Sequence, residues 1–232
     1  MPTVRQHPDF PRGEIKLLNH SSNVLQGNPW GDPCQRPLSV YLPPGYKQDT
    51  DPYIALWDLA AFSNSGPGHL NWRHHGENLP QRLDRLIHEG SLPPVVVVMP
   101  DCYSSLGGNQ YLNSPGVGRY ADYIVEELVP FLSQHINVVI DRSGRGVFGK
   151  SSGGYGALVL AMQYPETWGA LASHAGDVGF DLVYRPEFPV AASVLSACDG
   201  DIFRFLERYW HNKRLKPNYQ RFIIDILSII KL

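Results

Sequence analysis

The stretch VFGKSSGGYGALVLAM, residues 147–162, decides the fold because it joins a β-rich run to an apolar helical run through a turn of small residues. At its centre, residues 149–153 (GKSSG) form a G-x-S-x-G pattern. Such a pattern holds its serine on a sharp, strained turn and lifts the hydroxyl above the edge of a sheet. We therefore predict that Ser151 is a nucleophile and that the backbone N–H of Ser152 faces a developing oxyanion.

Outward from this turn, strand-like runs alternate with helical ones, which predicts an α/β fold with a doubly wound, mostly parallel sheet. After residue 180 only helical patterns follow, at 188–197, 200–211 and 217–231. We predict one domain, with a sheet core over 1–179 and a cap-like helical insertion over 180–232. The predicted strands are 14–25, 37–42, 53–59, 95–100, 145–149 and 168–173, and the predicted core helices are 77–89, 119–135 and 153–163.

Composition excludes several classes of protein. The 232 residues carry a formal net charge of −2 without a basic cluster, which disfavours a nucleic-acid partner. No apolar run approaches the ~20 residues of a membrane span, and the N-terminus lacks a signal-peptide core, so we expect a cytoplasmic protein. Three isolated cysteines predict neither a disulfide framework nor a zinc site. The histidines near residue 70 match no metal-ligand spacing, so no metal is expected.

The same turn also fits a second pattern. Residues 144–151 satisfy G-x-x-x-x-G-K-[ST], the phosphate-binding loop of nucleotide-binding proteins. That alternative requires residues 144–149 to form a loop, whereas Val147 and Phe148 are typical of a strand. We keep nucleotide binding as an alternative hypothesis.

Three stretches give the chain a resemblance to the esterase family of α/β hydrolases that includes S-formylglutathione hydrolases, siderophore and feruloyl esterases and mycolyl transferases. They are SVYLPPGY (39–46), the run from VVVVMPDC to LVPF (95–131) and VFGKSSGGYGAL to SHAGD (147–177). The resemblance implies hydrolysis of a small-molecule carboxylic ester or thioester without a cofactor. It assigns Ser151 as nucleophile and the N–H groups of Ser152 and Phe62 as oxyanion donors. Ala60-Ala61 departs from the family, which usually has a pair ending in glycine there.

The resemblance also raises the question of the base. Family members take their acid and histidine from loops after further strands, and no such strands are evident after residue 179. We therefore expect a shortened chain or a fragment, and a catalytically inactive hydrolase fold is the second alternative. Within the chain, Asp177 is a candidate acid and His174 a candidate base, since both follow a strand at the reactive edge of the sheet.

Two further predictions concern ligands and partners. Asp101, Asn109 and Gln110 follow the buried strand 95–100 at its carboxyl end, where α/β folds bind ligands, and are candidate substrate-binding residues. The run FIIDILSII (222–230) is apolar on nearly every face of a helix, which predicts burial against a second copy of the chain.

Overall fold

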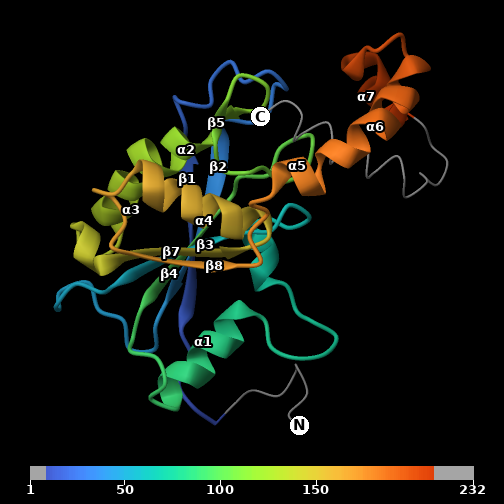
Figure 1. Ribbon diagram of the computed structural model, residues 1–232. Helices are drawn as coiled ribbons and strands as arrows, with labels where there is room; N and C mark the ends of the chain where they lie inside the picture. The colour runs from blue at the N-terminus through green and yellow to red at the C-terminus, as the bar shows by residue number, and fades with distance from the viewer. Residues whose placement is uncertain (1–8, 212–232) are drawn as a thin grey trace.

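The computed structural model describes residues 9–211, which contain a mixed six-stranded sheet with helices on both faces (Figure 1). The strand order is β1-β2-β4-β3-β7-β8. Strands β4, β3, β7 and β8 run parallel, while β1 and β2 form an antiparallel edge. The predicted α/β class and mostly parallel sheet are confirmed. The strands are β1 (Glu14–Ser21), β2 (Gln35–Leu42), β3 (Ala55–Leu59), β4 (Val96–Pro100), β7 (Arg145–Lys150) and β8 (Ala170–His174).

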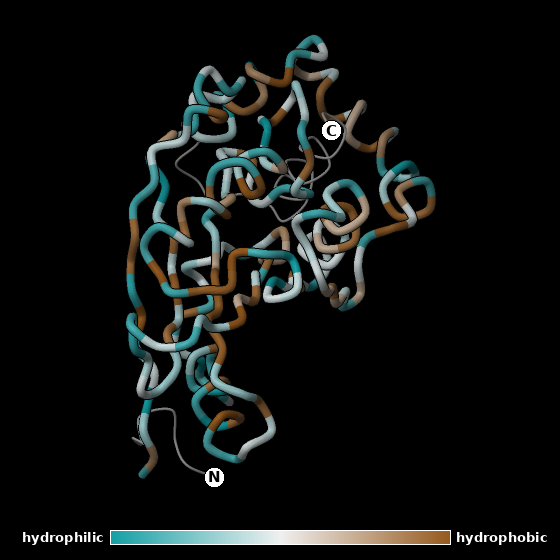
Figure 2. The backbone as a smooth tube through the Cα atoms, turned by 90° about the vertical axis from the view of Figure 1, so that its left-hand side faces the viewer, coloured by the Kyte–Doolittle hydropathy of each residue, from teal (hydrophilic) through white to brown (hydrophobic). Residues whose placement is uncertain are grey.

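The central strands are buried on both faces because β-branched residues alternate between two hydrophobic layers. In β4, Val96 and Val98 contact the larger core with Trp57, and Val97 and Met99 contact a smaller one. The larger core lies under α4 (Ser152–Gln163) and the helical run formed by α2 (Tyr120–Asp122), η2 (Tyr123–Leu128) and α3 (Val129–His135). The smaller core lies under α1 (Leu79–His88) on the opposite face (Figure 1). Along the chain, hydrophobic stretches alternate with hydrophilic ones (Figure 2), as expected for elements that each bury one side.

Two of the predicted elements differ from the structure, one in where it ends and one in its helix type. The first strand ends at Ser21 rather than at residue 25, because Glu127 accepts the backbone N–H groups of Asn23 (2.8 Å) and Val24 (3.0 Å) and so holds them in a turn. The predicted helix 119–135 is continuous in direction but contains a π-helical segment over Tyr123–Leu128. The structure also contains a hairpin of β5 (Asn113–Ser114) and β6 (Gly118–Arg119) that no sequence pattern predicts.

The C-terminal part of the described chain is helical, as predicted. It consists of α5 (Phe180–Val183), η4 (Arg185–Glu187), α6 (Phe188–Ser196) and α7 (Ile202–His211), which project beyond the sheet (Figure 1). These helices have their own small core, into which Leu106 from the loop after β4 also packs. The helix predicted at 217–231, and the association predicted for it, lie outside the described residues.

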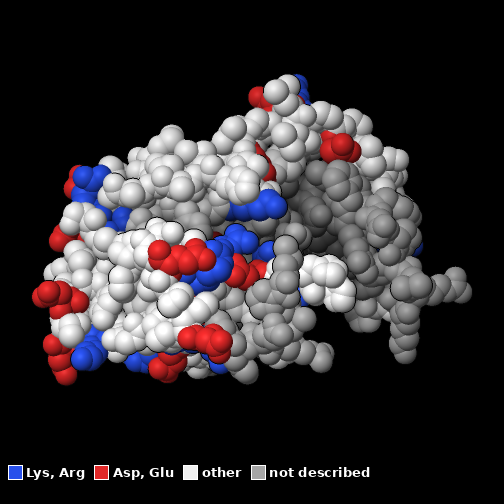
Figure 3. Space-filling view, turned by 90° about the horizontal axis from the view of Figure 1, so that it is seen from below, with Lys and Arg blue, Asp and Glu red and all other residues white. Residues whose placement is uncertain are grey.

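The surface that carries α1 has mixed charge. Acidic and basic side chains lie next to one another there (Figure 3), and Arg85 pairs with Glu77 at 2.8 Å and Glu89 at 2.9 Å. Within residues 9–211, no helix is long and apolar enough to cross a membrane.

Candidate active site

The centre of the candidate site is the turn between β7 and α4. Ser151 has φ 56° and ψ −122°, a conformation that non-glycine residues rarely adopt and that is found at functional sites. Its N–H donates to the carbonyl oxygen of His174 at 3.0 Å, and its own carbonyl accepts the N–H of Tyr155 at 2.9 Å. The turn is therefore held from β8 and from α4, and the side chain of Ser151 is half-buried rather than enclosed.

Both glycines of the G-x-S-x-G pattern are required by close backbone approaches. A Cβ on Gly153 would lie 1.9 Å from the carbonyl oxygen of Leu59 on β3. A Cβ on Gly149 would lie 2.5 Å from the carbonyl group of Gly153 and 2.6 Å from that of Leu59. Since these neighbours are backbone atoms of the sheet and of α4, no side chain fits at either position.

The same strand decides against the phosphate-loop alternative. Residues Arg145–Lys150 form β7, which pairs with β3 and β8, so they cannot also wrap a phosphate group. The nucleotide-binding hypothesis is therefore wrong for this turn.

Comparison with protein families identifies the fold as that of an esterase. A family described as "Putative esterase" matches residues 33–221, most of the chain. The chain belongs to this family. A Bacillus subtilis protein, YbbA, is 23% identical over 158 residues, or 63% of this chain and 58% of YbbA. Esterase Rv1288 of Mycobacterium tuberculosis is 29% identical over 84 residues, 36% of this chain and 18% of Rv1288. The chain thus spans less than two thirds of the length of these relatives.

Solved structures agree on the fold. A ferulic acid esterase of Anaeromyces mucronatus superposes with a TM-score of 0.59 at 18% identity, with 77% of this chain and 64% of that one covered. An S-formylglutathione hydrolase of Agrobacterium tumefaciens gives 0.55 at 23% identity, with 77% and 63% covered. The serine hydrolase FphF of Staphylococcus aureus gives 0.57 at 20% identity, with 74% and 60% covered.

In this member of the esterase family, the carboxylate of Asp177 faces the Ser151 turn. Its oxygens accept hydrogen bonds from the hydroxyl groups of Ser151 (3.0 Å), Ser152 (3.1 Å) and Tyr184 (2.8 Å). Desolvation and the hydrogen bond to Asp177 raise the pKa of Tyr184 well above its ordinary value, so this phenol stays a donor at neutral and alkaline pH. The structure thus brings together Ser151 and the predicted acid, and adds Tyr184, which no sequence pattern indicated.

The predicted oxyanion donors lie on two neighbouring elements. Ser152 is the first residue of α4, and the first N–H groups of a helix have no acceptor within it. The N–H of Phe62, in the loop after β3, has no acceptor within residues 9–211, while its carbonyl accepts the N–H of Gly108 at 2.9 Å. Two residues earlier, the carbonyl group of Ala60 accepts a hydrogen bond from the hydroxyl group of Tyr111 at 2.6 Å. The loop is therefore anchored by carbonyl groups, which leaves this N–H available.

Of the three predicted substrate-binding residues, two are engaged in holding their own loop. Asp101 pairs with Arg36 at 3.3 Å and accepts the N–H of Tyr103 at 3.1 Å. Asn109 accepts the N–H of Tyr111 at 2.7 Å and donates to the carbonyl of Cys102.

The third of these residues, Gln110, is fully buried, and its side chain donates to the hydroxyl group of Tyr184 at 3.4 Å. It thereby extends the hydrogen-bonded chain from Ser151 through Asp177.

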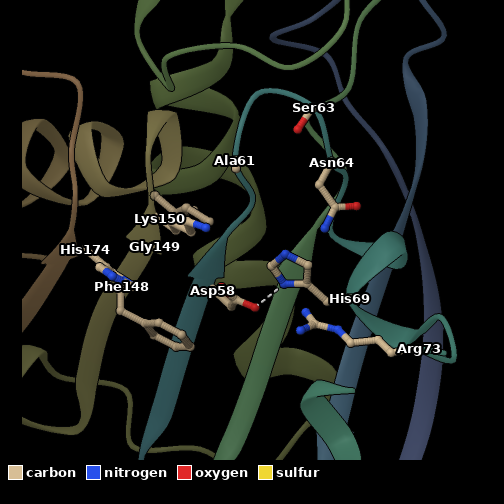
Figure 4. A pocket seen from close by; sticks show the side chains of 11 residues that line it. Asp58, Ala61, Ser63, Asn64, His69, Arg73, Phe148, Gly149, Lys150 and His174 are labelled. Atoms are coloured by element: carbon tan, nitrogen blue, oxygen red, sulfur yellow. Dashed lines mark hydrogen bonds and ion pairs between the residues drawn. The ribbon is translucent and has the colours of Figure 1, made fainter. Parts of the chain in front are cut away.

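The candidate base, His174, is the last residue of β8, at the edge of the sheet where it is predicted. Only its backbone contacts Ser151, and within the described residues no hydrogen bond joins its imidazole to the Ser151 hydroxyl. The imidazole instead lines a pocket of about 350 Å³ beside the Ser151 turn (Figure 4). This pocket also contains a hydrogen-bonded pair, Asp58 and His69, that the sequence analysis did not predict.

Proposed function

We propose that the chain is a hydrolase of small carboxylic esters or thioesters that forms an acyl-enzyme on Ser151. The observation that carries this proposal is the strained backbone of Ser151, which directs a half-exposed hydroxyl group to Asp177 beside the N-terminus of α4. The family membership and the fold shared with known esterases support it.

The reaction would proceed in two steps. Ser151 Oγ attacks the acyl carbon, and its proton passes to Asp177, which already accepts the hydrogen bond from that hydroxyl. The N–H groups of Ser152 and Phe62 stabilise the oxyanion of the tetrahedral intermediate. Collapse of the tetrahedral intermediate expels the alcohol or thiol, which takes the proton back from Asp177. Water then attacks the acyl-enzyme, releases the acid and restores the Ser151 hydroxyl.

A second candidate function is a hydrolase fold that does not turn over. A carboxylate is a weaker base than an imidazole, and general-base catalysis contributes about 10²–10⁴-fold to rate when the base is well matched. Within residues 9–211, no imidazole is hydrogen-bonded to Ser151. For the second candidate, this observation predicts acylation of Ser151 without release of the acid.

A fluorophosphonate probe tests the proposal, because it reacts with an activated serine and does not require deacylation. We expect one adduct on Ser151, its loss in Ser151→Ala and its retention in Ser152→Ala, which keeps the backbone N–H. Hydrolysis of 4-nitrophenyl acetate by the same proteins then separates the two candidates. Turnover that Ser151→Ala abolishes supports the esterase, and labelling without turnover supports the second candidate. An adduct that persists in Ser151→Ala contradicts both.

A further inference from the structure

Several ionisable side chains line the pocket beside the Ser151 turn. Asp58 on β3 and His69 on η1 (Pro67–Leu70) form its floor, where Nδ1 of His69 contacts the Asp58 carboxylate. Lys150, at the end of β7, and Arg73 extend toward this pair from different sides (Figure 4). The pocket therefore gathers charged groups from three separate parts of the chain: β3, the segment 69–73 and the end of β7.

The balance of charge in this pocket is positive whatever the protonation state of His69. Asp58 is 5% exposed and contacts His69, whereas neither Lys150 nor Arg73 makes an ion pair with another described residue. With neutral His69, the carboxylate leaves an excess of one positive charge among these four side chains. With protonated His69 the excess is two, and His174 can only add to it.

The pocket has the size and the polar lining for a small anion. Its volume of about 350 Å³ accommodates a phosphate or carboxylate group with part of a carbon chain. The side chains of Ser63 and Asn64 also line it and offer uncharged hydrogen-bond donors. Arginine and lysine recognise oxyanions through charge-assisted hydrogen bonds, which are stronger than those between neutral groups.

We propose that this pocket is a binding site for a small oxyanion, a phosphate or a carboxylate, held between Lys150 and Arg73. Two sources fit this chemistry. The anion is either a free ion or the charged end of an ester bound at Ser151, since Gly149 and Lys150 line the pocket and precede Ser151 directly. Only the second source rests on the function proposed above.

Calorimetric titration with inorganic phosphate, at matched ionic strength against sodium chloride, tests the site without any requirement for catalysis. We expect the wild type, Ser151→Ala and the control Arg82→Gln to bind phosphate equally. Arg73→Gln and Lys150→Gln should each weaken binding by about tenfold or more, the equivalent of one charge-assisted hydrogen bond. No phosphate binding beyond chloride, or unchanged affinity in either pocket variant, would overturn the proposal. Failure of the esterase function alone leaves this titration intact.

The source of the anion is decided by comparing two substrates, 4-nitrophenyl acetate and mono-4-nitrophenyl succinate, which ends in a carboxylate. A lower KM for the succinate that Arg73→Gln removes assigns the pocket to the substrate. An equal KM for both esters, together with phosphate binding, assigns it to a free anion.

Discussion

Strands β4 and β8 belong to one sheet, yet all five residues of β4 are buried and all five residues of β8 are exposed. β4 lies between β2 and β3 and carries the run VVVMP, whereas β8 pairs with β7 alone among the described residues and carries ALASH. β4 is therefore covered by a strand on each side, whereas β8 is the edge strand among the described residues.

This difference divides the candidate site into two halves. The backbone at Ser151 and Ser152 follows β7 and packs closely on β3 through Gly153, and both strands lie in the centre of the sheet. Its hydrogen bond to β8 is made by the N–H of Ser151 to the carbonyl group of His174, so this half does not depend on a side chain of β8. The side chains of His174 and Asp177 come from β8 and the loop that follows it. We infer that the backbone half is rigid, and that the hydroxyl partner of Ser151 depends on a less protected part of the molecule.

The largest expected effect comes from filling the space between β3 and α4. Gly153→Ala places a methyl group 1.9 Å from the carbonyl oxygen of Leu59, so we expect the free energy of unfolding to fall by about 3 kcal/mol or more. Gly179→Ala is the matched control, because its nearest neighbour would be 3.9 Å away. Urea denaturation measures both. If both variants lost the same free energy of unfolding, the claim that close packing fixes the backbone half of the site would be wrong.

The second prediction compares the two strands directly. Val98→Ala removes a fully buried side chain from β4, and we expect it to cost about 2–3 kcal/mol through lost burial and a cavity. Leu171 on β8 is 46% exposed, so Leu171→Ala should cost less than about 1 kcal/mol. The same denaturation experiment checks both. A larger loss for Leu171→Ala would show that β8 is covered in solution.

Local patterns explain why the backbone half could be predicted from the sequence. The run VVVVMP indicates a strand buried on both faces, and GKSSG indicates a strand, a turn and a helix with close glycine contacts. Both depend on residues that are near one another in the chain. The prediction that Asp177 follows a strand at the reactive edge had the same basis.

The rest depends on irregular loops and turns that bring nearby residues of the chain together, and these leave no periodic signal. The pair of Asp58 and His69 requires a turn at η1 that brings His69 back to β3. Tyr184 reaches Asp177 because the short helix α5 between them brings the two side chains together. The position of Asp101 and Asn109 after β4 predicts a ligand-binding role, and it gives no sign of the hydrogen bonds by which their polar atoms hold the loop itself.

The third prediction concerns Asp122, a buried carboxylate at the end of α2, which contrasts with the exposed side chains of β8. Asp122 is desolvated, but hydrogen bonds from Asn113, Tyr164 and Arg119 more than offset this and lower its pKa. A lowered pKa adds stability above the unfolded-state value, and that stability is lost as pH falls through the folded-state value. We expect Asp122→Asn to lower the free energy of unfolding by about 1–2 kcal/mol at pH 7 and by less below about pH 3.

Asp181 on α5 is the control for this experiment, because its side chain is 88% exposed. Asp181→Asn should be indistinguishable from the wild type in chemical denaturation at both pH values. An Asp122→Asn variant whose stability deficit is the same at pH 3 and pH 7 would contradict the role of the ionised carboxylate.

The smallest expected effect concerns the side-chain half of the site. Tyr184→Phe removes a hydroxyl group that holds Asp177 toward Ser151 and that accepts only a long hydrogen bond, 3.4 Å, from Gln110. The ring itself still packs against Phe180 in the variant. We expect fluorophosphonate labelling to slow by about two- to tenfold, the equivalent of one hydrogen bond, with a stability change below about 1 kcal/mol. Tyr103→Phe, on an exposed loop, should change neither quantity. If Tyr184→Phe instead destabilised the protein as strongly as Val98→Ala, α5 would belong to the rigid core, and the division of the site into two halves would be wrong.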